Sequence, residues 1–217
     1  MTQKISFPDA AGLYLEIGSS LLSRWTSKLI AGFQSAFFID EEQKLDYYRD
    51  RGIAHTKGGR YLRALPLLEL VAEQRPDDLE TSLHLGLCQI KLGNRDDGIE
   101  RLEAAYARDQ ANANTAKVLG LAYAQAGEHE RALPVLTVAL KAFPDNFSLL
   151  YRLGASLDHL GRPAEAVPYF ERALEQRPKA VKVIRALAYG LEQLGDRERA
   201  LACFKRADEL EDNDKAA

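Results

Sequence analysis

Apolar and small residues return every 34 residues along most of the chain, with polar residues at the positions between them. Large apolar side chains hold one phase of this period, and alanines hold another. The large apolar phase comprises Leu68, Leu102, Leu136, Phe170 and Phe204, and the alanine phase comprises Ala64, Ala132, Ala166 and Ala200. A period of this length predicts a stack of repeated units, each of which buries its apolar face against its neighbours.

Glycine and proline divide each period into two helices. One glycine series, which includes Gly120, stands inside the first helix, where glycine costs about 1 kcal/mol relative to alanine. A cost repeated in this way indicates that the partner helix approaches closely. A second series, which includes Gly127, ends the first helix, where a left-handed backbone is needed. Prolines such as Pro144 then end the second helix.

These features together are the signature of the tetratricopeptide repeat (TPR), a helix–turn–helix of 34 residues. In the second unit Gly98 replaces the alanine, and in the last unit Asp212 stands where a proline ends other units. The acidic segment 208–217 is predicted to be a solvated cap that frays. We expect an all-α TPR solenoid, a right-handed and hook-like superhelix with a concave groove. Its five units are 45–78, 79–112, 113–146, 147–180 and 181–214, followed by a tail, 215–217.

Residues 1–44 form a divergent arm before the regular units. One period upstream of the first unit, the segments 12–22 and 27–39 are predicted to be the two helices of a degenerate repeat, with a hinge at 40–44. The arm either caps the array at the first unit or docks into the groove of another copy, and the residues favour neither alternative. The second alternative would propagate into open assemblies unless a ring closes. The arm is rich in aromatic residues: Tyr14, Trp25, Phe33, Phe37 and Phe38.

Composition supports the helical prediction and argues against several functions. The chain has 33 Leu and 31 Ala but only 21 Val, Ile and Thr together, which favours helices over a large sheet. A net charge of −3 shows no polybasic bias, so we expect no nucleic-acid partner. No run approaches the ~18 apolar residues of a membrane span, and no secretory signal is visible. Cys88 and Cys203 are far apart and are expected to be free thiols in a reducing cytoplasm.

The first helices of the units are predicted to line the concave face. Their groove positions combine an apolar floor with a basic rim over the first three units, which suits an amphipathic helix or an extended peptide with acidic residues. A single floor residue could equally fill space between units, but the set as a whole favours binding. The candidate partner-binding residues are Arg49, Ile53, Lys57, Leu83, Leu87, Lys91, Lys117, Leu121, Tyr151, Arg185 and Tyr189.

Other kinds of site find little support. TPR proteins that hold a C-terminal carboxylate use a basic residue followed by asparagines, and although Arg49 fits the first position, Ile53, His84 and Val118 do not fit those that follow. No phosphate loop, HExxH motif or nucleophile elbow is present, so we expect a non-enzymatic protein without a cofactor. The four histidines occupy four different repeat positions, and we therefore expect no metal site.

Five segments show a more specific likeness: YYRDRGIAHTKGGRY (47–61), LHLGL (83–87), VLGLAYAQ (118–125), FSLLYRLGASLDHLGR (147–162) and ALAYGLEQLG (186–195). They resemble the MamA family, TPR proteins of the magnetosomes of magnetotactic bacteria. The resemblance implies a cytoplasmic protein that lies peripherally on the cytosolic face of the magnetosome membrane. It also implies self-assembly into large homo-oligomers through residues 11–44, recruitment of other magnetosome proteins, and Arg49 as a groove contact.

Two hypotheses about function follow. In the first, the chain is a self-assembling, non-enzymatic scaffold around a vesicle that binds other proteins through its TPR surfaces. In the second, it is a monomeric cytoplasmic TPR adaptor or chaperone that binds one client peptide in its concave groove. The two hypotheses differ first in the size of the particle that the full-length chain forms.

Overall fold

The computed structural model describes residues 40–216, so the predicted helices of the arm and its five aromatic residues lie outside the described residues. The chain divides into two units, Met1–Tyr47 and Tyr48–Ala217. Of the first unit only residues 40–47 are described, and all of them after Asp40 belong to the beginning of one helix. The groove predicted from the sequence falls within the second unit.

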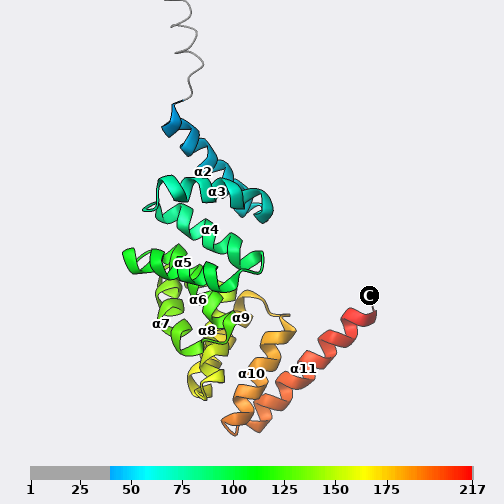
Figure 1. Cartoon of the computed structure of the whole chain (residues 1–217). Coiled ribbons are helices and arrows are strands. Elements are labelled where there is room, and N and C mark those ends of the chain that lie inside the picture. Colours follow the sequence, from blue (N-terminus) through cyan, green and yellow to red (C-terminus); the bar gives the residue numbers. More distant parts are fainter. Residues whose placement is uncertain (1–39, 217) are drawn as a thin grey trace, which may run out of the picture. The chain divides into compact units, whose positions relative to one another are not determined.

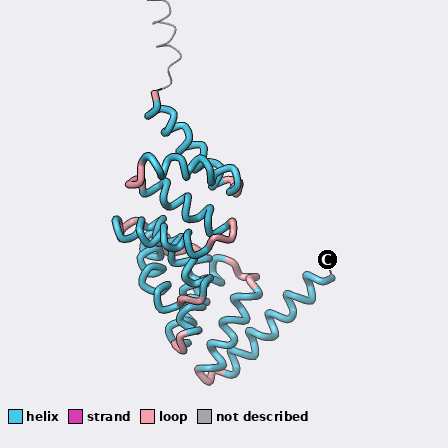
Figure 2. The backbone as a smooth tube through the Cα atoms, viewed as in Figure 1, coloured by secondary structure: helices cyan, strands magenta, loops and turns pink. Residues whose placement is uncertain are grey.

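Ten α-helices account for most of the described residues (Figures 1 and 2). The prediction of an all-α fold is therefore confirmed. The helices are α2 (Glu41–Lys57), α3 (Tyr61–Gln74), α4 (Leu79–Lys91), α5 (Arg95–Arg108), α6 (Ala113–Ala126), α7 (His129–Ala142), α8 (Phe147–His159), α9 (Pro163–Gln176), α10 (Val181–Gln193) and α11 (Arg197–Ala216).

The helices of the second unit stack in chain order. Each first helix from α4 onward packs against its own second helix, and each second helix packs against the first helix of the next pair. The first helices α4, α6, α8 and α10 also contact one another in sequence. One side of this stack is thus formed by first helices, which is the side that a TPR array uses as its groove.

The helix ends are set by local chemistry that also recurs with the repeat. Asp78, Asn112 and Asn146 occupy one phase, and the side chain of each accepts a hydrogen bond from a backbone N–H in the first turn of the helix that follows. Such N-caps satisfy donors that have no partner inside the helix. At the other end of α6, Gly127 has a φ of +83°, a left-handed backbone conformation that is strained for a residue with a side chain.

Close approach of the paired helices explains the glycines inside the first helices. A Cβ atom at Gly120 would lie 2.8 Å from Cδ2 of Leu136, and one at Gly154 would lie 2.8 Å from Cε1 of Phe170. Leu136 and Phe170 are both completely buried. The close helix contact inferred from the sequence is therefore present. In each of these units, the large apolar side chain of the second helix occupies the space left by the glycine of the first helix.

The helices of the second repeat, 79–112, make this contact in a different way. A Cβ atom at Gly98 would lie 2.7 Å from the carbonyl oxygen of Gly86 and 2.6 Å from Cγ1 of Ile90. The replacement of alanine by Gly98 thus lets the backbones of α4 and α5 meet directly. The departure from the repeat pattern at Gly98 therefore corresponds to a closer crossing of α4 and α5.

We expect the substitution Gly98→Ala to lower the free energy of unfolding by up to about 2 kcal/mol. Alanine is the better helix former by about 1 kcal/mol, but overpacking against a backbone oxygen costs roughly 1–3 kcal/mol. Chemical denaturation followed by circular dichroism measures the difference. Gly190→Ala is the control, because a Cβ atom there would meet only Cγ2 of Val167, at 3.2 Å. We expect the control to be neutral or slightly stabilising, and equal stabilisation by both substitutions would contradict the prediction.

Both ends of the described helices differ from the sequence-based expectation. Residues 41–44, expected to be part of a hinge, form the first turn of α2. At the other end, α11 is 20 residues long, whereas the second helices before it have 14, and it continues through the expected cap and tail to Ala216. Asp212 allows this because it lacks the ring with which proline ends a helix. Among the described helices, none is long and apolar enough to cross a membrane.

Candidate partner-binding groove

The main cavity on the groove side lies between α4 and α6 and has a volume of about 760 Å³. The end of α2 and the turn before α4 complete its wall. Four of the residues predicted from the sequence line this cavity, namely Lys57, Leu83, Leu87 and Lys117. Its floor is apolar and its edge carries two lysines, as the sequence analysis expected for the early units.

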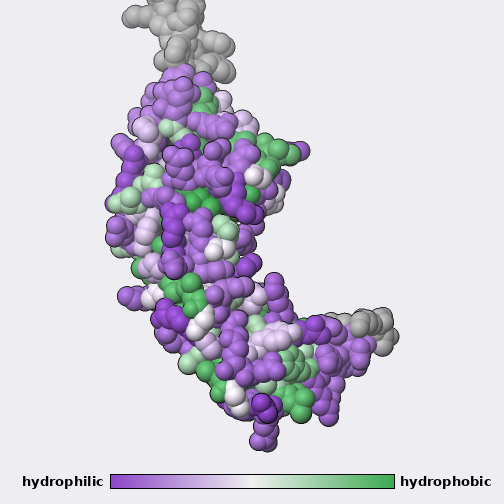
Figure 3. All heavy atoms as spheres, turned by 60° about the horizontal axis from the view of Figure 1, so that its bottom comes forward, coloured by the Kyte–Doolittle hydropathy of each residue, from purple (hydrophilic) through white to green (hydrophobic). Residues whose placement is uncertain are grey.

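A second cavity of about 200 Å³ continues the first along the same two helices. Leu87 and Val118 line both cavities, so the two form one groove. The second cavity adds the predicted residues Lys91 and Leu121. Together, the two cavities bring six of the eleven candidate residues onto one surface. Figure 3 shows that apolar residues on one face of the molecule form separate patches in a mostly hydrophilic surface.

The remaining candidate residues have other surroundings. Ile53 is only 6% exposed and belongs to a small core with Leu68 and Cys88. Arg185 forms ion pairs with Asp208 and Glu211 of α11, each at 3.1 Å. Tyr151 packs against the core of the later repeats, with its ring centroid 6.3 Å from that of Phe170. Tyr189 is 53% exposed and meets the ring of Phe204 edge-on at 5.1 Å.

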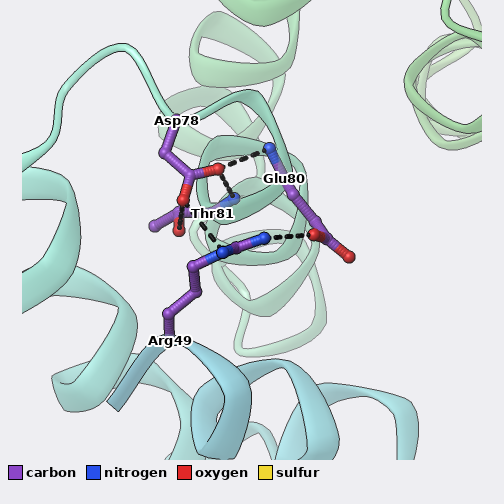
Figure 4. Close-up of polar contacts among 4 residues, drawn as sticks. All are labelled: Arg49, Asp78, Glu80 and Thr81. Carbon is purple, nitrogen blue, oxygen red and sulfur yellow. Dashed lines mark hydrogen bonds and ion pairs between the residues drawn. The ribbon is translucent and has the colours of Figure 1, made fainter. Parts of the chain in front are cut away.

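Arg49 joins the first two repeats through the N-terminus of α4 (Figure 4). Its Nη2 atom donates to Oε2 of Glu80 at 2.8 Å, and its Nε atom lies 3.0 Å from Oδ2 of Asp78. The hydrogen bond to Glu80 is the main reason why the pKa of Arg49 lies above its ordinary value, while partial burial opposes it. The guanidinium is therefore already bound to two carboxylates of its own chain.

Asp78 holds this arrangement in place. Its Oδ1 atom accepts hydrogen bonds from the backbone N–H groups of Glu80 at 3.0 Å and Thr81 at 3.1 Å, and its Oδ2 atom accepts one from the hydroxyl group of Thr81 at 3.0 Å (Figure 4). Carboxylates are favourable at a helix N-terminus because the helix dipole is positive there. The cap of α4 thus fixes the carboxylate that receives Arg49.

The sequence analysis missed the acidic part of the groove. Asp77, Asp78 and Glu80 line the main cavity beside Lys57 and Lys117, so its edge carries both signs of charge. The signal that could have found Asp78 was its phase, since Asn112 and Asn146 stand at the same position and also cap helices. A partner for this groove therefore needs acidic groups near the lysines and not along its whole length.

His84 is a second residue that the sequence analysis did not assign to the groove. It lines the main cavity, is 9% exposed, and its Nδ1 atom has no hydrogen-bond partner among the described residues. Burial lowers the pKa of His84 below its ordinary value, and Lys57 lowers it further, while Glu80 opposes the change. His84 is accordingly a neutral imidazole that can accept or donate one hydrogen bond to a peptide backbone.

The groove is suited to binding rather than to chemistry. Leu83, Leu87 and Val118 offer contacts to apolar side chains, and the lysines and carboxylates around them can orient a polar segment. Within residues 40–216, no group of three or more His, Cys, Asp and Glu side chains is placed to hold a metal ion. The ammonium group of Lys117 lies 4.6 Å from the ring centroid of Phe143, a cation–π contact that holds this lysine at the groove.

Known proteins are similar to this chain in both sequence and structure. Family models of the tetratricopeptide repeat match residues 49–113, 89–146, 118–181 and 157–217. The magnetosome protein MamA of Magnetospirillum gryphiswaldense is 42% identical over 78 residues, which is 36% of this chain and 36% of that protein. MamA of Paramagnetospirillum magneticum is 41% identical over a segment of the same length. The sequence match thus spans about a third of the length of these curated relatives.

The solved structures extend the similarity to the whole array. A structure of MamA from strain MSR-1 is 44% identical, has a TM-score of 0.73, and matches over 79% of this chain and 98% of that chain. The chain belongs to the MamA family of TPR proteins. A structure of MamA from strain AMB-1 is 46% identical with a TM-score of 0.72 over 76% of this chain and 96% of that one. A further MamA structure at 24% identity and a TM-score of 0.68 supports the fold alone.

Membership of the MamA family gives the chain its general role. The chain is a protein-binding TPR scaffold of the MamA type, and the prediction of a non-enzymatic protein is confirmed by the family. The fold prediction, a TPR array, is confirmed by the same matches. The roles of individual groove residues, including Arg49 and the lysines, stay predictions.

Proposed function

We propose that the chain assembles with copies of itself on the cytosolic face of the magnetosome membrane and recruits other magnetosome proteins there. The observation that carries this proposal is the continuous groove along α4 and α6, with an apolar floor and lysines at its edge. The curated relatives are magnetosome proteins by name, which supports the location. No cofactor and no nucleic acid take part in this function.

The occupant that we propose for the groove is the arm of a second copy. Residues 11–44 combine polar positions with five aromatic side chains, which suits a groove whose floor is formed by Leu83, Leu87 and Leu121. An arm that binds the next copy leaves that copy's own arm free, so the contact is heterologous and can continue into large particles. The outer surfaces of such a particle then remain open to other partners.

The alternative is a monomeric cytoplasmic adaptor or chaperone that places one client peptide in the same groove. Both functions use the same residues, so the geometry of the groove does not separate them. The mass of the full-length protein does, because the adaptor predicts a monomer and the scaffold predicts large particles. Affinity for a single client peptide by a stable monomer would favour the alternative.

We expect the double substitution Lys57→Glu and Lys117→Glu to weaken self-association at least tenfold. Both ammonium groups line the main cavity, and reversing them places like charges opposite the carboxylates of an incoming arm, which are Glu16, Asp40, Glu41 and Glu42. Light scattering coupled to size-exclusion chromatography measures the particle mass across a concentration series. Arg49→Glu is less suitable, because the new carboxylate would face Asp78 and Glu80 and would destabilise the fold as well.

The matched control reverses two other exposed lysines, Lys141 and Lys179, which do not line the groove. It changes the net charge by the same amount, so it corrects for general electrostatic repulsion. We expect the control to assemble like the unaltered protein. Large particles that survive the groove substitutions would refute the groove as the site of assembly.

A further inference from the structure

The turn between α2 and α3 differs in charge from the corresponding turns of the later repeats. In three of those turns, two positions three residues apart hold an ion pair between an arginine and a carboxylate. The first repeat has Arg60 and Arg63 at these two positions, so that both are basic. The ion pairs of the later turns are Glu128–Arg131 at 2.5 Å, Arg162–Glu165 at 2.7 Å and Asp196–Arg199 at 3.6 Å.

Arg60 and Arg63 are exposed, and neither has an ion-pair partner within residues 40–216. Their helix supplies no compensation nearby, because the first turn of α3 contains no acidic residue, whereas the first turns of α5, α7, α9 and α11 contain at least one each. Two like charges three residues apart repel each other at a modest cost. Among the five repeats, only the first has two like charges at these positions, which points to an anion supplied by a partner.

A leucine projects beside the two arginines. Leu62 is 77% exposed, which is the highest value for a large apolar residue in the described part of the chain. The same phase in the later repeats holds Asp96, Glu130, Ala164 and Glu198. A shallow depression of about 440 Å³ connects this leucine and both arginines with Gly59, Tyr61 and Leu92. The turn thus joins an apolar side chain to an uncompensated basic pair.

The local potential is positive. Partial burial lowers the pKa of His55 below its ordinary value, and the charges of Arg60, Arg51 and Arg63 lower it further. The neutral form of His55 is therefore favoured, chiefly by burial and further by the positive charges of the three arginines. An anionic group that reached the turn would meet attraction from several sides.

We propose that residues 58–63, here named the basic turn, dock onto the surface of an anionic lipid bilayer. The guanidinium groups of Arg60 and Arg63 bind lipid phosphates, and Leu62 inserts into the interface between headgroups and acyl chains. An acidic peptide fits less well, because peptide sites are concave and here the apolar side chain projects. The inference rests on the proposed peripheral association with a membrane and assigns it a surface.

A single basic turn binds weakly, since one apolar side chain and two charges give a modest affinity. Self-assembly would make membrane binding by the whole particle stronger. Copies held in one particle present many basic turns to the same membrane, and each turn after the first binds at a high effective concentration. The proposed assembly and the basic turn therefore reinforce each other without sharing residues, because the groove lysine Lys57 lies outside the basic turn.

The deciding substitution is Arg60→Glu in the full-length protein. It places a carboxylate three residues before Arg63, which is the arrangement of Glu128 and Arg131 in a later turn. We expect the fold to be as stable as before or slightly more stable, while binding to vesicles falls roughly thirtyfold, because the site loses one positive charge and gains a negative one. A purely structural role for Arg60 could not give higher stability together with lost binding.

The assay is co-sedimentation with vesicles of equal parts phosphatidylcholine and phosphatidylglycerol, compared with vesicles of phosphatidylcholine alone. We expect binding only to the anionic vesicles, a decrease at high salt, and a roughly five- to tenfold decrease for Leu62→Ser. The control combines Arg197→Ala with Leu201→Ser, two exposed residues in the last repeat, and we expect it to bind normally.

Absence of binding to anionic vesicles would overturn the proposal, and so would unchanged binding by Arg60→Glu. If the unaltered protein instead bound polyglutamate and not vesicles, and Arg60→Glu lost that binding, the partner would be an acidic protein and the lipid proposal would be wrong. Particle mass measured on the same samples separates this test from the groove. Particles that form but do not bind vesicles count against the basic turn alone.

Discussion

Replacing Phe170 by alanine is expected to lower the free energy of unfolding by about 3–5 kcal/mol, the largest effect that we expect from one side chain. Phe170 is completely buried and is the largest of the fully buried side chains in the described part of the chain. Its ring lies so close to Gly154 that a Cβ atom there would be 2.8 Å away. The backbone of α8 is therefore fitted to this ring, and neighbouring atoms cannot collapse easily into the cavity that alanine would leave.

Urea denaturation followed by circular dichroism measures this loss. The matched control is Phe204→Ala, which removes the same side chain at the same phase of the last repeat. Phe204 is only partly buried because no later helix pair within residues 40–216 covers it, so we expect a loss of about 1–2 kcal/mol. Equal losses at the two positions would show that burial between successive repeats does not determine stability in this array.

The prediction of the fold succeeded where one residue fixes one local geometry. Gly127 was expected to end a helix in a left-handed conformation, and it does. Gly120 was expected to mark a close helix contact, and Leu136 fills that contact. These residues act within one unit, and the repeat shows each of them several times. A period therefore carries most of the information about helices and their pairing.

The candidate groove was harder to predict, because it depends on contacts between units. Arg49 occupies a groove position by sequence, but its charge is bound by Glu80 of the next unit and by Asp78, the residue that ends its own unit and caps α4. That contact depends on the rotation between successive hairpins and on the cap of α4, and neither follows from a single unit. For the same reason His84 was not assigned to the groove, although its burial and its unpartnered Nδ1 atom mark it in the structure.

The end of the array shows a third limit. The acidic composition of residues 208–217 predicted a solvated cap followed by a tail, whereas α11 is helical to Ala216. Arg185 of α10 binds Asp208 and Glu211 on successive turns of α11, so two of the acidic side chains anchor the helix instead of repelling one another. Composition alone describes the charge of a segment but not the cation that an adjacent helix brings to it.

Deleting residues 1–39 is expected to convert large particles of the full-length protein into monomers or small species. The deletion removes the aromatic arm and leaves every described helix complete, because α2 begins at Glu41. Glu41 and Glu42 remain in the first turn of α2, where acidic side chains stabilise the helix terminus. Particle mass by light scattering with size-exclusion chromatography measures the change, and far-ultraviolet circular dichroism checks that the array stays helical.

The deletion and the groove substitutions test two halves of one contact, so their combination is the sharpest experiment. If the arm of one copy binds the groove of the next, Lys57→Glu and Lys117→Glu should have no further effect once residues 1–39 are gone, because the contact is already lost. Additive effects would show that arm and groove act in separate contacts. Large particles that persist after the deletion would place the assembly contact on the described helices, and the arm would then serve only as a cap of the first repeat.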